Sequence, residues 1–404
     1  MCPPAPPKSN DSRAFRVVVA PDSFKGTLTA AEAAEAIAEG LAQILPSGSE
    51  ILRAPMADGG EGTVDAFLAA VPDARRVECD ATDPLGRPIR AFFGYRPGER
   101  LAVVELAAAS GLPLLAPEER DPRAASTAGT GLVLRAALER GARRIVLGLG
   151  GSATNDGGAG LAAALGARVL DAAGAPLPPG GAALARAAAL DLSGLPAALR
   201  EGRVALDVAC DVTSPLCGPD GASAVFGPQK CAPAVRGDPA RLGATVAELD
   251  AALGNWARVV AAATGRDRST EPGAGAAGGA GFAAVALLGG TLRPGAALVA
   301  DAVGLAARVA GADWVVTGEG ALDAQTFRGK TPAGVAAVAR AAGSRVAACC
   351  GRIDLGDEEL AALGVAAAEA SSRPGLGMPE SREQAFLWLA TAAKRLANKM
   401  LAVS

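Results

Sequence analysis

The chain has 404 residues, of which half are hydrophobic and a fifth are charged, and its net charge is −3. This length is long for a single hydrophobic core and favours two domains. The acidic balance and the 3% of aromatic residues argue against a nucleic-acid-binding protein, which normally presents a basic face or stacking aromatics.

The sequence contains no histidine. This excludes Ser-His-Asp hydrolysis, a phosphohistidine intermediate and proton transfer by an imidazole, so that any general base is Asp, Glu, Lys, Tyr or Cys. The seven cysteines are irregularly spaced and include no CxxC pair, which argues against a zinc site. We interpret them as reduced thiols of a cytoplasmic protein.

The first two predicted units have the same shape, a short strand followed by a loop and a helix. Residues 15–20 (FRVVVA) are an apolar run typical of a buried parallel strand, and a capping box (TAAE) predicts a helix over residues 29–42. In the second unit, residues 51–55 predict a strand and residues 63–70 a helix. The loops between strand and helix read PDSFKGTL and MADGGEG.

The pattern then changes. Residues 75–79, 89–95 and 101–106 predict strands joined by the short turns PLGRP and RPGER, which is an antiparallel meander. We therefore expect a domain boundary near residue 80.

Helices and strands alternate again in the rest of the chain. Strands are predicted at residues 144–149, 203–209, 313–317 and 345–349, and helices at 127–140, 159–165, 242–264, 331–342 and 380–401. The stretch 273–292 has no charge but seven glycines, which suits close backbone packing or a binding loop better than a membrane span. Residues 1–14 have no apolar signal-peptide core and are expected to form a flexible tail.

Four predicted strands are each followed by a loop rich in glycine and carboxylates. These loops are residues 22–26, 58–62, 150–158, and 317–320 with Asp323. Ligands bind outside the carboxyl ends of strands in open parallel sheets, where glycines bring backbone N–H groups close to an anion. Each loop alone is also an ordinary tight turn, but four together favour a site.

Carboxylates are the unusual component of these loops, because acids repel a bare phosphate. The six are Asp22, Asp58, Glu61, Asp156, Glu319 and Asp323. A divalent metal would resolve the conflict, since Mg²⁺ is typically held by one or two carboxylates plus substrate phosphates. A carboxylate could instead deprotonate an attacking hydroxyl. Both roles indicate a kinase.

Lysines and one further aspartate pair add to this picture. The chain has only six lysines, and three of them, Lys25, Lys230 and Lys330, lie in the loop motifs DSFK, GPQK and RGK. A lysine supplies a compact point charge for phosphate, although ordinary surface placement remains open. Asp207 and Asp211 share one face if their strand continues that far, which suits either substrate contact or a strand-end cap.

At these residues the sequence resembles the bacterial type-1 glycerate kinase family. The resemblance rests on APDSFKGTLTA, PMADGGEGT, DPLGRP, GLGGSATNDGGAG, CDVTSPLCG with GPQK, and TGEGALDAQTFRGKTP, in family order. It implies ATP-dependent phosphorylation of D-glycerate with Mg²⁺, usually at the 2-hydroxyl. It also implies two α/β domains with a cleft between them: a Rossmann-like parallel-sheet domain of residues 15–80 plus 290–404, and an inserted mixed α/β domain of residues 81–289.

The chemistry of the matched motifs suggests a role for each candidate residue. Asp22 and Asp211 are candidates to orient or deprotonate the acceptor hydroxyl, and Lys25 is the third catalytic candidate. The metal candidates are Asp58, Glu61 and Asp156. The substrate- and phosphate-binding candidates are Ser23, Arg87, Gly150, Gly151, Ser152, Asn155, Gly157, Lys230, Gly318, Glu319, Gly320, Asp323 and Lys330.

Two other classes of protein compete with this interpretation. The loose GxGxxG pattern of the 150–158 loop suggests an NAD-dependent oxidoreductase, but no acidic ribose ligand stands out after a second strand. A nucleotide-sensing regulator is the non-enzymatic alternative, and no basic face supports it. The sequence leaves open whether the 2- or the 3-hydroxyl is phosphorylated and whether the protein forms a homodimer.

Overall fold

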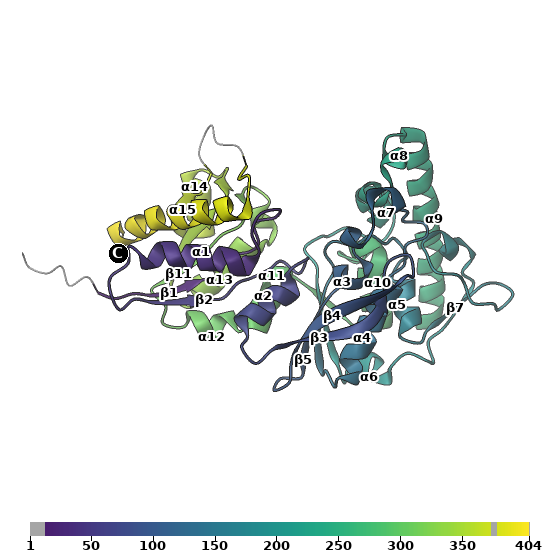
Figure 1. The fold of residues 1–404 in the computed structure, drawn as a ribbon. Coiled ribbons are helices and arrows are strands. Elements are labelled where there is room, and N and C mark those ends of the chain that lie inside the picture. The colour runs from purple at the N-terminus through teal and green to yellow at the C-terminus, as the bar shows by residue number, and fades with distance from the viewer. Residues whose placement is uncertain (1–12, 373–377, 404) are drawn as a thin grey trace, which may run out of the picture. The chain divides into compact units, whose positions relative to one another are not determined.

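A computed structural model shows the fold and describes residues 13–372 and 378–403 (Figure 1). The expected N-terminal tail therefore lies almost wholly outside the described residues. Helices alternate with parallel and antiparallel strands, which confirms the predicted α/β class. In the described part of the chain, no helix is both long enough and apolar enough to cross a lipid bilayer.

The chain packs into two compact units. Unit 1 comprises Met1–Pro55, Leu305–Ala324 and Val335–Ser404, and unit 2 comprises Met56–Gly304 and Gln325–Gly334. Unit 1 is thus assembled from both ends of the chain, and most of unit 2 is one continuous segment.

Unit 1 contains a five-stranded sheet in which all strands are parallel, in the order β15-β13-β11-β1-β2. Its strands are β1 (Arg16–Val19), β2 (Glu50–Arg53), β11 (Trp314–Thr317), β13 (Arg345–Cys350) and β15 (Val365–Ala370). The sequence predicts the first four but not β15, which reads VAAAEA, because alanine and glutamate are poor strand formers.

Two long helices cover one part of this sheet. Helix α1 (Ala30–Ala42) begins at the predicted capping box, in which Thr29 accepts the Glu32 N–H and Glu32 accepts the Thr29 N–H. Helix α15 (Arg382–Ala402) lies beside it (Figure 1). The other elements are α12 (Leu305–Val309), α13 (Thr331–Ala341), α14 (Asp357–Leu363) and the strand pair β12 (Ala321–Leu322) and β14 (Arg352–Ile353).

Unit 2 is built on a mixed sheet in the order β10-β9-β6-β5-β4-β3. Its strands are β3 (Arg75–Thr82), β4 (Pro88–Arg96), β5 (Leu101–Glu105), β6 (Arg144–Gly148), β9 (Ala205–Ala209) and β10 (Thr291–Arg293). Strands β3, β4 and β5 form the predicted antiparallel meander, and β5, β6, β9 and β10 run parallel.

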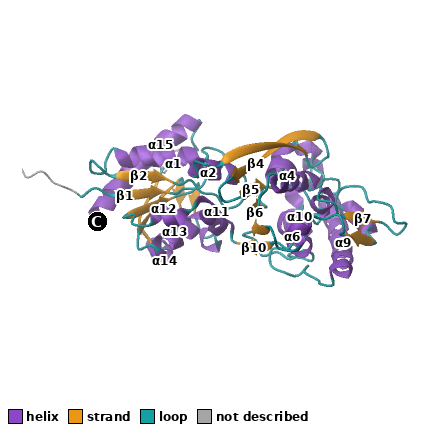
Figure 2. Cartoon of the chain, turned by 90° about the horizontal axis from the view of Figure 1, so that it is seen from below, coloured by secondary structure: helices purple, strands orange, loops and turns teal. Residues whose placement is uncertain are grey.

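Helices lie on both faces of this sheet: Figure 2 shows α4 and α10 on one side, and α2 and α11 on the other. The helices are α2 (Thr63–Ala70), α3 (Ala107–Ser110), α4 (Ala128–Glu139), α5 (Ala159–Ala164), α6 (Ala197–Arg200), α7 (Ala222–Phe226), α8 (Pro233–Arg236), α9 (Pro239–Thr264), α10 (Ala276–Leu287) and α11 (Gly295–Val303). A small pair, β7 (Arg168–Leu170) and β8 (Ala189–Asp191), is antiparallel. Trp256, Phe93 and Phe282 are fully buried in the core.

The compact units divide the chain at other points than the expected residues 80 and 290. Helix α2 packs on β4 and β5, and β3 pairs with β4 along its whole length, so both elements belong to unit 2. Helix α11 likewise packs on α2 and β9. The antiparallel meander thus starts inside unit 2 rather than at its border.

Candidate active site

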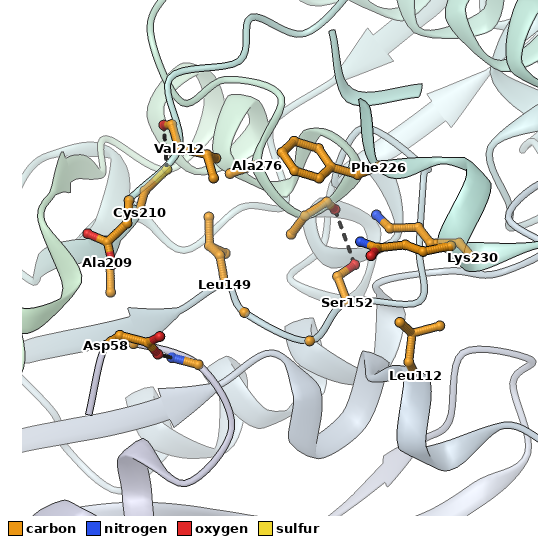
Figure 3. A pocket seen from close by; sticks show the side chains of 17 residues that line it. Asp58, Leu112, Leu149, Ser152, Ala209, Cys210, Val212, Phe226, Lys230 and Ala276 are labelled. Atoms are coloured by element: carbon orange, nitrogen blue, oxygen red, sulfur yellow. Dashed lines mark hydrogen bonds between the residues drawn. The ribbon is translucent and has the colours of Figure 1, made fainter. Parts of the chain in front are cut away.

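Unit 2 contains a pocket of about 380 Å³ at the carboxyl ends of β6 and β9. Its walls are formed by Asp58, Gly59, Gly60, Leu112, Leu149, Gly150, Gly151, Ser152, Ala209, Cys210, Asp211, Val212, Phe226, Gln229, Lys230, Ala276 and Ala277. Figure 3 shows Asp58 and Cys210 at one side, Lys230 at the other, and Leu149 between them. Ligands are expected at this edge of a sheet with parallel strands.

Two of the predicted glycine loops meet backbone to backbone under this pocket. A Cβ on Gly148 would lie 2.2 Å from the Gly59 carbonyl oxygen, and one on Gly150 would lie 2.5 Å from the Gly60 Cα. Any side chain at these positions would push the loops apart. The glycines therefore serve first to bring the 58–60 and 148–151 segments together, and this close contact places backbone atoms of both loops on the pocket wall.

One end of the pocket is acidic. Asp58 accepts the Gly60 N–H at 2.9 Å, and Asp211 accepts the Gly295 N–H, at the start of α11, at 2.8 Å. Asp211 as a residue is exposed, but its carboxylate is partly enclosed. This enclosure raises the pKa of Asp211 to about 6. The hydrogen bond from the Gly295 N–H lowers this pKa, and the negative charge of Asp58 raises it further.

Gly295 is the residue that permits this arrangement, although no sequence motif points to it. A Cβ at this position would lie 1.9 Å from the Asp58 carbonyl oxygen and 3.0 Å from Asp211 Oδ2. Only a residue without a side chain lets α11 begin between the two aspartates. The N-terminus of α11 also favours negative charge beside it.

The other end of the pocket is basic. Lys230 ends the short 3₁₀ turn Pro228–Lys230 and is only 2% exposed, although it lines the cavity. Its Nζ donates to the Thr154 carbonyl oxygen at 2.6 Å. Burial lowers the pKa of Lys230 to about 7, and the charge of Asp156 opposes this shift.

Asp156, a predicted metal ligand, is buried away from the cavity. Its carboxylate accepts hydrogen bonds from the Thr127 N–H and hydroxyl, the Ser126 hydroxyl and the N–H groups of Gly158 and Gly160. Burial raises the pKa of Asp156, and these donors oppose the shift. This carboxylate ties the starts of α4 and α5 together, so we do not retain it as a metal ligand.

The other residues of the 150–158 loop lie partly at the pocket and partly in the core. Gly150, Gly151 and Ser152 line the pocket, whereas Asn155 is buried and donates from Nδ2 to the Ser223 hydroxyl at 2.9 Å. Gly157, with φ +59°, accepts a hydrogen bond from Trp256 Nε1 at 3.0 Å. The first half of the loop faces the cavity and the second half packs into the core.

In unit 1, the structure brings two other predicted loops together at the carboxyl ends of β1 and β11. The Asp22 N–H donates to the Gly318 carbonyl oxygen at 2.8 Å, and the Asp22 carboxylate accepts the Ser23 N–H at 2.6 Å. Gly320 lies beside Lys25: a Cβ placed on Gly320 would lie 3.9 Å from the backbone nitrogen of Lys25. Ser23, Gly318, Glu319 and Gly320 thus belong to one loop cluster with Asp22 and Lys25, as predicted for strands of one sheet.

The remaining candidates do not line the pocket in unit 2. Glu61 is exposed, and Lys330 lies outside the pocket wall. Arg87 forms ion pairs with Asp83 and Glu119, which shape the DPLGRP turn between β3 and β4.

Two further aspartates, Asp323 and Asp207, do not line the pocket. Asp323 follows β12 in unit 1 and is half-buried. Asp207 was expected to share a face with Asp211 only if their strand continued that far; it pairs with Arg144 at 2.9 Å. Strand β9 ends at Ala209, so only Asp211 reaches the pocket.

Several pocket residues escaped the sequence interpretation. Leu112 and Phe226 come from short helical turns, and Gln229 belongs to the GPQK motif but was not a predicted site residue. Ala276 and Ala277 come from the glycine-rich stretch. The glycines of that stretch could have indicated the pocket, since they permit an unusual backbone. Ala277, Gly278 and Gly279 all have positive φ, and this kinks α10. The kink lets the Gly278 carbonyl accept the Gly157 N–H at 2.9 Å.

Glu105 was also missed, because a single acid at the end of an apolar strand has no motif. It is buried, and one carboxylate oxygen accepts the Val64 N–H, near the start of α2, at 2.6 Å. Burial raises the pKa of Glu105 to about 7, while the N–H groups of Val64 and Gly62 lower it. The side chain fixes the end of the 58–62 loop.

The donor set fits Mg²⁺ bound together with a phosphate ligand. Among residues 13–372 and 378–403, no group of three or more His, Cys, Asp or Glu side chains could hold a metal alone. Asp58 and Asp211 are close enough for one charge to shift the pKa of the other. Mg²⁺ usually takes one or two carboxylates and completes its shell with phosphate oxygens and water.

Glycine loops, carboxylates and a buried lysine at the ends of parallel strands define an α/β protein of the type that binds phosphorylated ligands. The chain belongs to the glycerate kinase family, whose model matches residues 17–401.

Known relatives agree with this membership. The chain is 47% identical over 326 residues to the glycerate kinase of Bacillus subtilis strain 168, covering 81% of this chain and 82% of the relative. It is 44% identical over 326 residues to the glycerate 2-kinase of Escherichia coli K12, with 81% and 82% covered. A solved structure from Salmonella typhimurium LT2, provisionally described as glycerate kinase 2, has a TM-score of 0.84 at 41% identity, covering 97% of this chain and 99% of its own.

Proposed function

We propose that the protein catalyses the phosphorylation of D-glycerate by ATP at the 2-hydroxyl, giving 2-phosphoglycerate and ADP. Family membership over residues 17–401 supports the reaction, and the relative named glycerate 2-kinase supports the position. The single observation that carries the proposal for this chain is the pocket in unit 2, with paired aspartates at one end and a buried lysine at the other.

The two ends of the pocket suit two different parts of a phosphoryl-transfer reaction. Lys230 offers a positive charge to a carboxylate or phosphate, and the loop around Gly150 and Gly151 offers backbone N–H groups. Asp58 would hold Mg²⁺ with a phosphate, and the ion would neutralise charge on the transferred group.

Asp211 is the best candidate base in this pocket. Histidine is absent from the sequence, and a base works best when its pKa is near the working pH. The pKa of Asp211 at about 6 leaves it ionised at neutral pH and more basic than an ordinary aspartate. Its role is to orient the acceptor hydroxyl and to accept its proton.

The loop cluster of unit 1 is proposed as a second ligand-binding region. Asp22 and Lys25 keep their assignment as catalytic candidates, and Ser23 and the 318–320 segment keep theirs as binding candidates. The hydrogen bond between Asp22 and Gly318 supports a common role for these loops. We also infer a cytoplasmic location, because the six described cysteines are free thiols.

The proposal is tested by measuring ADP release with ATP, Mg²⁺ and D-glycerate. Turnover is expected to require all three. Replacing Asp211 with Asn is expected to lower kcat by ~10²-fold to 10⁴-fold, the usual contribution of a general base. Asp220→Asn, which changes an exposed aspartate of unit 2, is the matched control and should keep normal turnover. ATP hydrolysis that does not depend on glycerate would contradict the proposal.

A further inference from the structure

Lys230 has an uncommon environment for a lysine. Its ammonium group is almost completely buried and is directed toward the pocket in unit 2 (Figure 3). An ammonium carries three N–H donors, yet among the described residues its side chain has one hydrogen-bond acceptor, the Thr154 carbonyl oxygen at 2.6 Å. The protein alone therefore satisfies this group only in part.

The charge of Lys230 is not balanced by a direct ion pair. Within the described part of the chain, no carboxylate lies within 4.0 Å of its Nζ. Asp156 is the nearest acid in electrostatic terms, but its oxygens already accept five donor groups of the protein. Asp58, another acid that lines the cavity, lies at the opposite side from Lys230 (Figure 3). Asp211 lies near Asp58, because both approach Gly295.

We infer that Lys230 takes up a proton when an anionic group of the substrate binds in this pocket, so that ligand binding and protonation of Lys230 are coupled. The inference rests on the proposed function and deepens it. The anion is the carboxylate of glycerate or a phosphate of the nucleotide, since both would complete the shell of the ammonium in the same way.

The energetics of burial support this coupling. An ammonium without a counter-charge is costly in a protein interior, and the usual response is loss of the proton. Burial lowers the pKa of Lys230 to about 7, so a large fraction is neutral in the free protein at slightly basic pH. An arriving anion reverses the balance, because an opposite charge nearby favours the protonated form.

The step is balanced in atoms and charge. The neutral amine accepts one proton from water or buffer and becomes an ammonium, and the bound anion stays unprotonated. The neutral amine has a lone pair and would not attract the anion. Binding is therefore expected to become weaker as the pH rises above 7. Each binding event must then protonate Lys230 at a lower proton concentration.

Isothermal titration calorimetry can count this proton. D-glycerate alone and MgADP alone are titrated into the full chain at pH 8 in two buffers of different ionisation enthalpy. With a free pKa of about 7, uptake of about 0.9 proton is expected at pH 8 and about 0.5 at pH 7. At pH 8 Asp211, whose pKa is about 6, is already ionised and contributes no uptake.

The variant Lys230→Met removes the charge but keeps a long, apolar side chain suited to a buried position. Its proton uptake is expected to fall to zero and its affinity for the responding ligand to weaken by about tenfold. Lys394→Met, in α15 of unit 1, is the matched control and is expected to keep both. A thermal unfolding midpoint of Lys230→Met that is equal to or above the wild-type value would show that the variant folds.

The two ligands identify the source of the anion. Uptake with glycerate assigns the carboxylate, and uptake with MgADP assigns a phosphate; either supports the inference. Heats that are independent of buffer for both ligands, or uptake that persists in Lys230→Met, would overturn it. ADP release by the same wild-type sample tests the proposed function separately: a protein that turns over without proton uptake loses only the role of Lys230.

Discussion

Glu105→Gln is predicted to change how stability depends on pH. The carboxyl group is buried under the start of α2, where it accepts the Val64 N–H at 2.6 Å. Glutamine keeps the carbonyl oxygen that accepts this hydrogen bond but cannot ionise. The variant therefore removes one titration from unit 2 with little change in shape.

The magnitude follows from the pKa of Glu105, which burial raises from 4.5 to about 7. A shift of about 2.5 units at about 1.36 kcal/mol each corresponds to roughly 3 kcal/mol. Because the folded pKa lies above the unfolded value, the protonated group contributes stability that is complete below pH 4.5. That contribution is lost as the pH rises through 7, since the folded protein must then ionise a buried acid.

Urea unfolding of unit 2 between pH 5 and pH 8 measures this loss. The wild-type protein is expected to lose about 2.5 kcal/mol relative to Glu105→Gln across this range, because part of the full loss already occurs below pH 5. Asp211 and Lys230, with pKa values of about 6 and 7, also titrate in this window, but they are the same in both proteins and cancel in the difference. Glu139→Gln, at an exposed position on α4, controls for the type of substitution. Wild-type and Glu105→Gln curves that stay parallel from pH 5 to pH 8 would refute the argument.

Three further predictions test other parts of the site. For Asp211, kcat/KM of the wild-type enzyme is expected to rise with pH through about 6, because a base acts only when ionised; a profile that is flat from pH 5 to pH 8 would count against this role. Gly295→Ala is expected to lower activity by at least tenfold while circular dichroism stays native, because a Cβ would lie 1.9 Å from the Asp58 oxygen and displace the aspartates; normal activity would show that α11 can shift freely. Asp156→Asn is expected to lower stability by about 2 kcal/mol, since its oxygens accept several buried donors, with no specific effect on the Mg²⁺ dependence of turnover; a changed Mg²⁺ requirement would restore it as a metal ligand.

The sequence predicted most of the fold because its local signals are strong. The capping box at Thr29 and the antiparallel meander both match the structure, and the apolar runs before each loop are strands. Strand β15 was missed because its alanine-rich sequence carries no strand pattern, and the β7-β8 pair was missed because each strand has only three residues.

The candidate site was predicted in part. Two loops after parallel strands of one sheet meet as expected, at Asp22 and Gly318 in unit 1. The 58–62 loop does not join them: it follows β2 of the unit 1 sheet but packs against Gly148 and Gly150, at the end of β6 of the other sheet. Spacing alone could not separate Asp211, at the pocket, from Asp156, in the core, because each lies in a loop that follows a predicted strand. The difference depends on which donors surround each carboxylate, and packing between distant segments decides that.

The phosphorus NMR spectrum of the product tests the central claim most directly. After incubation with ATP, Mg²⁺ and D-glycerate, the spectrum is expected to show ADP and a phosphomonoester whose phosphorus couples to the single proton of carbon 2, as in 2-phosphoglycerate. A phosphomonoester coupled to the two protons of carbon 3 would contradict the assigned hydroxyl. A spectrum with inorganic phosphate as the sole new product beside ADP would contradict glycerate phosphorylation itself.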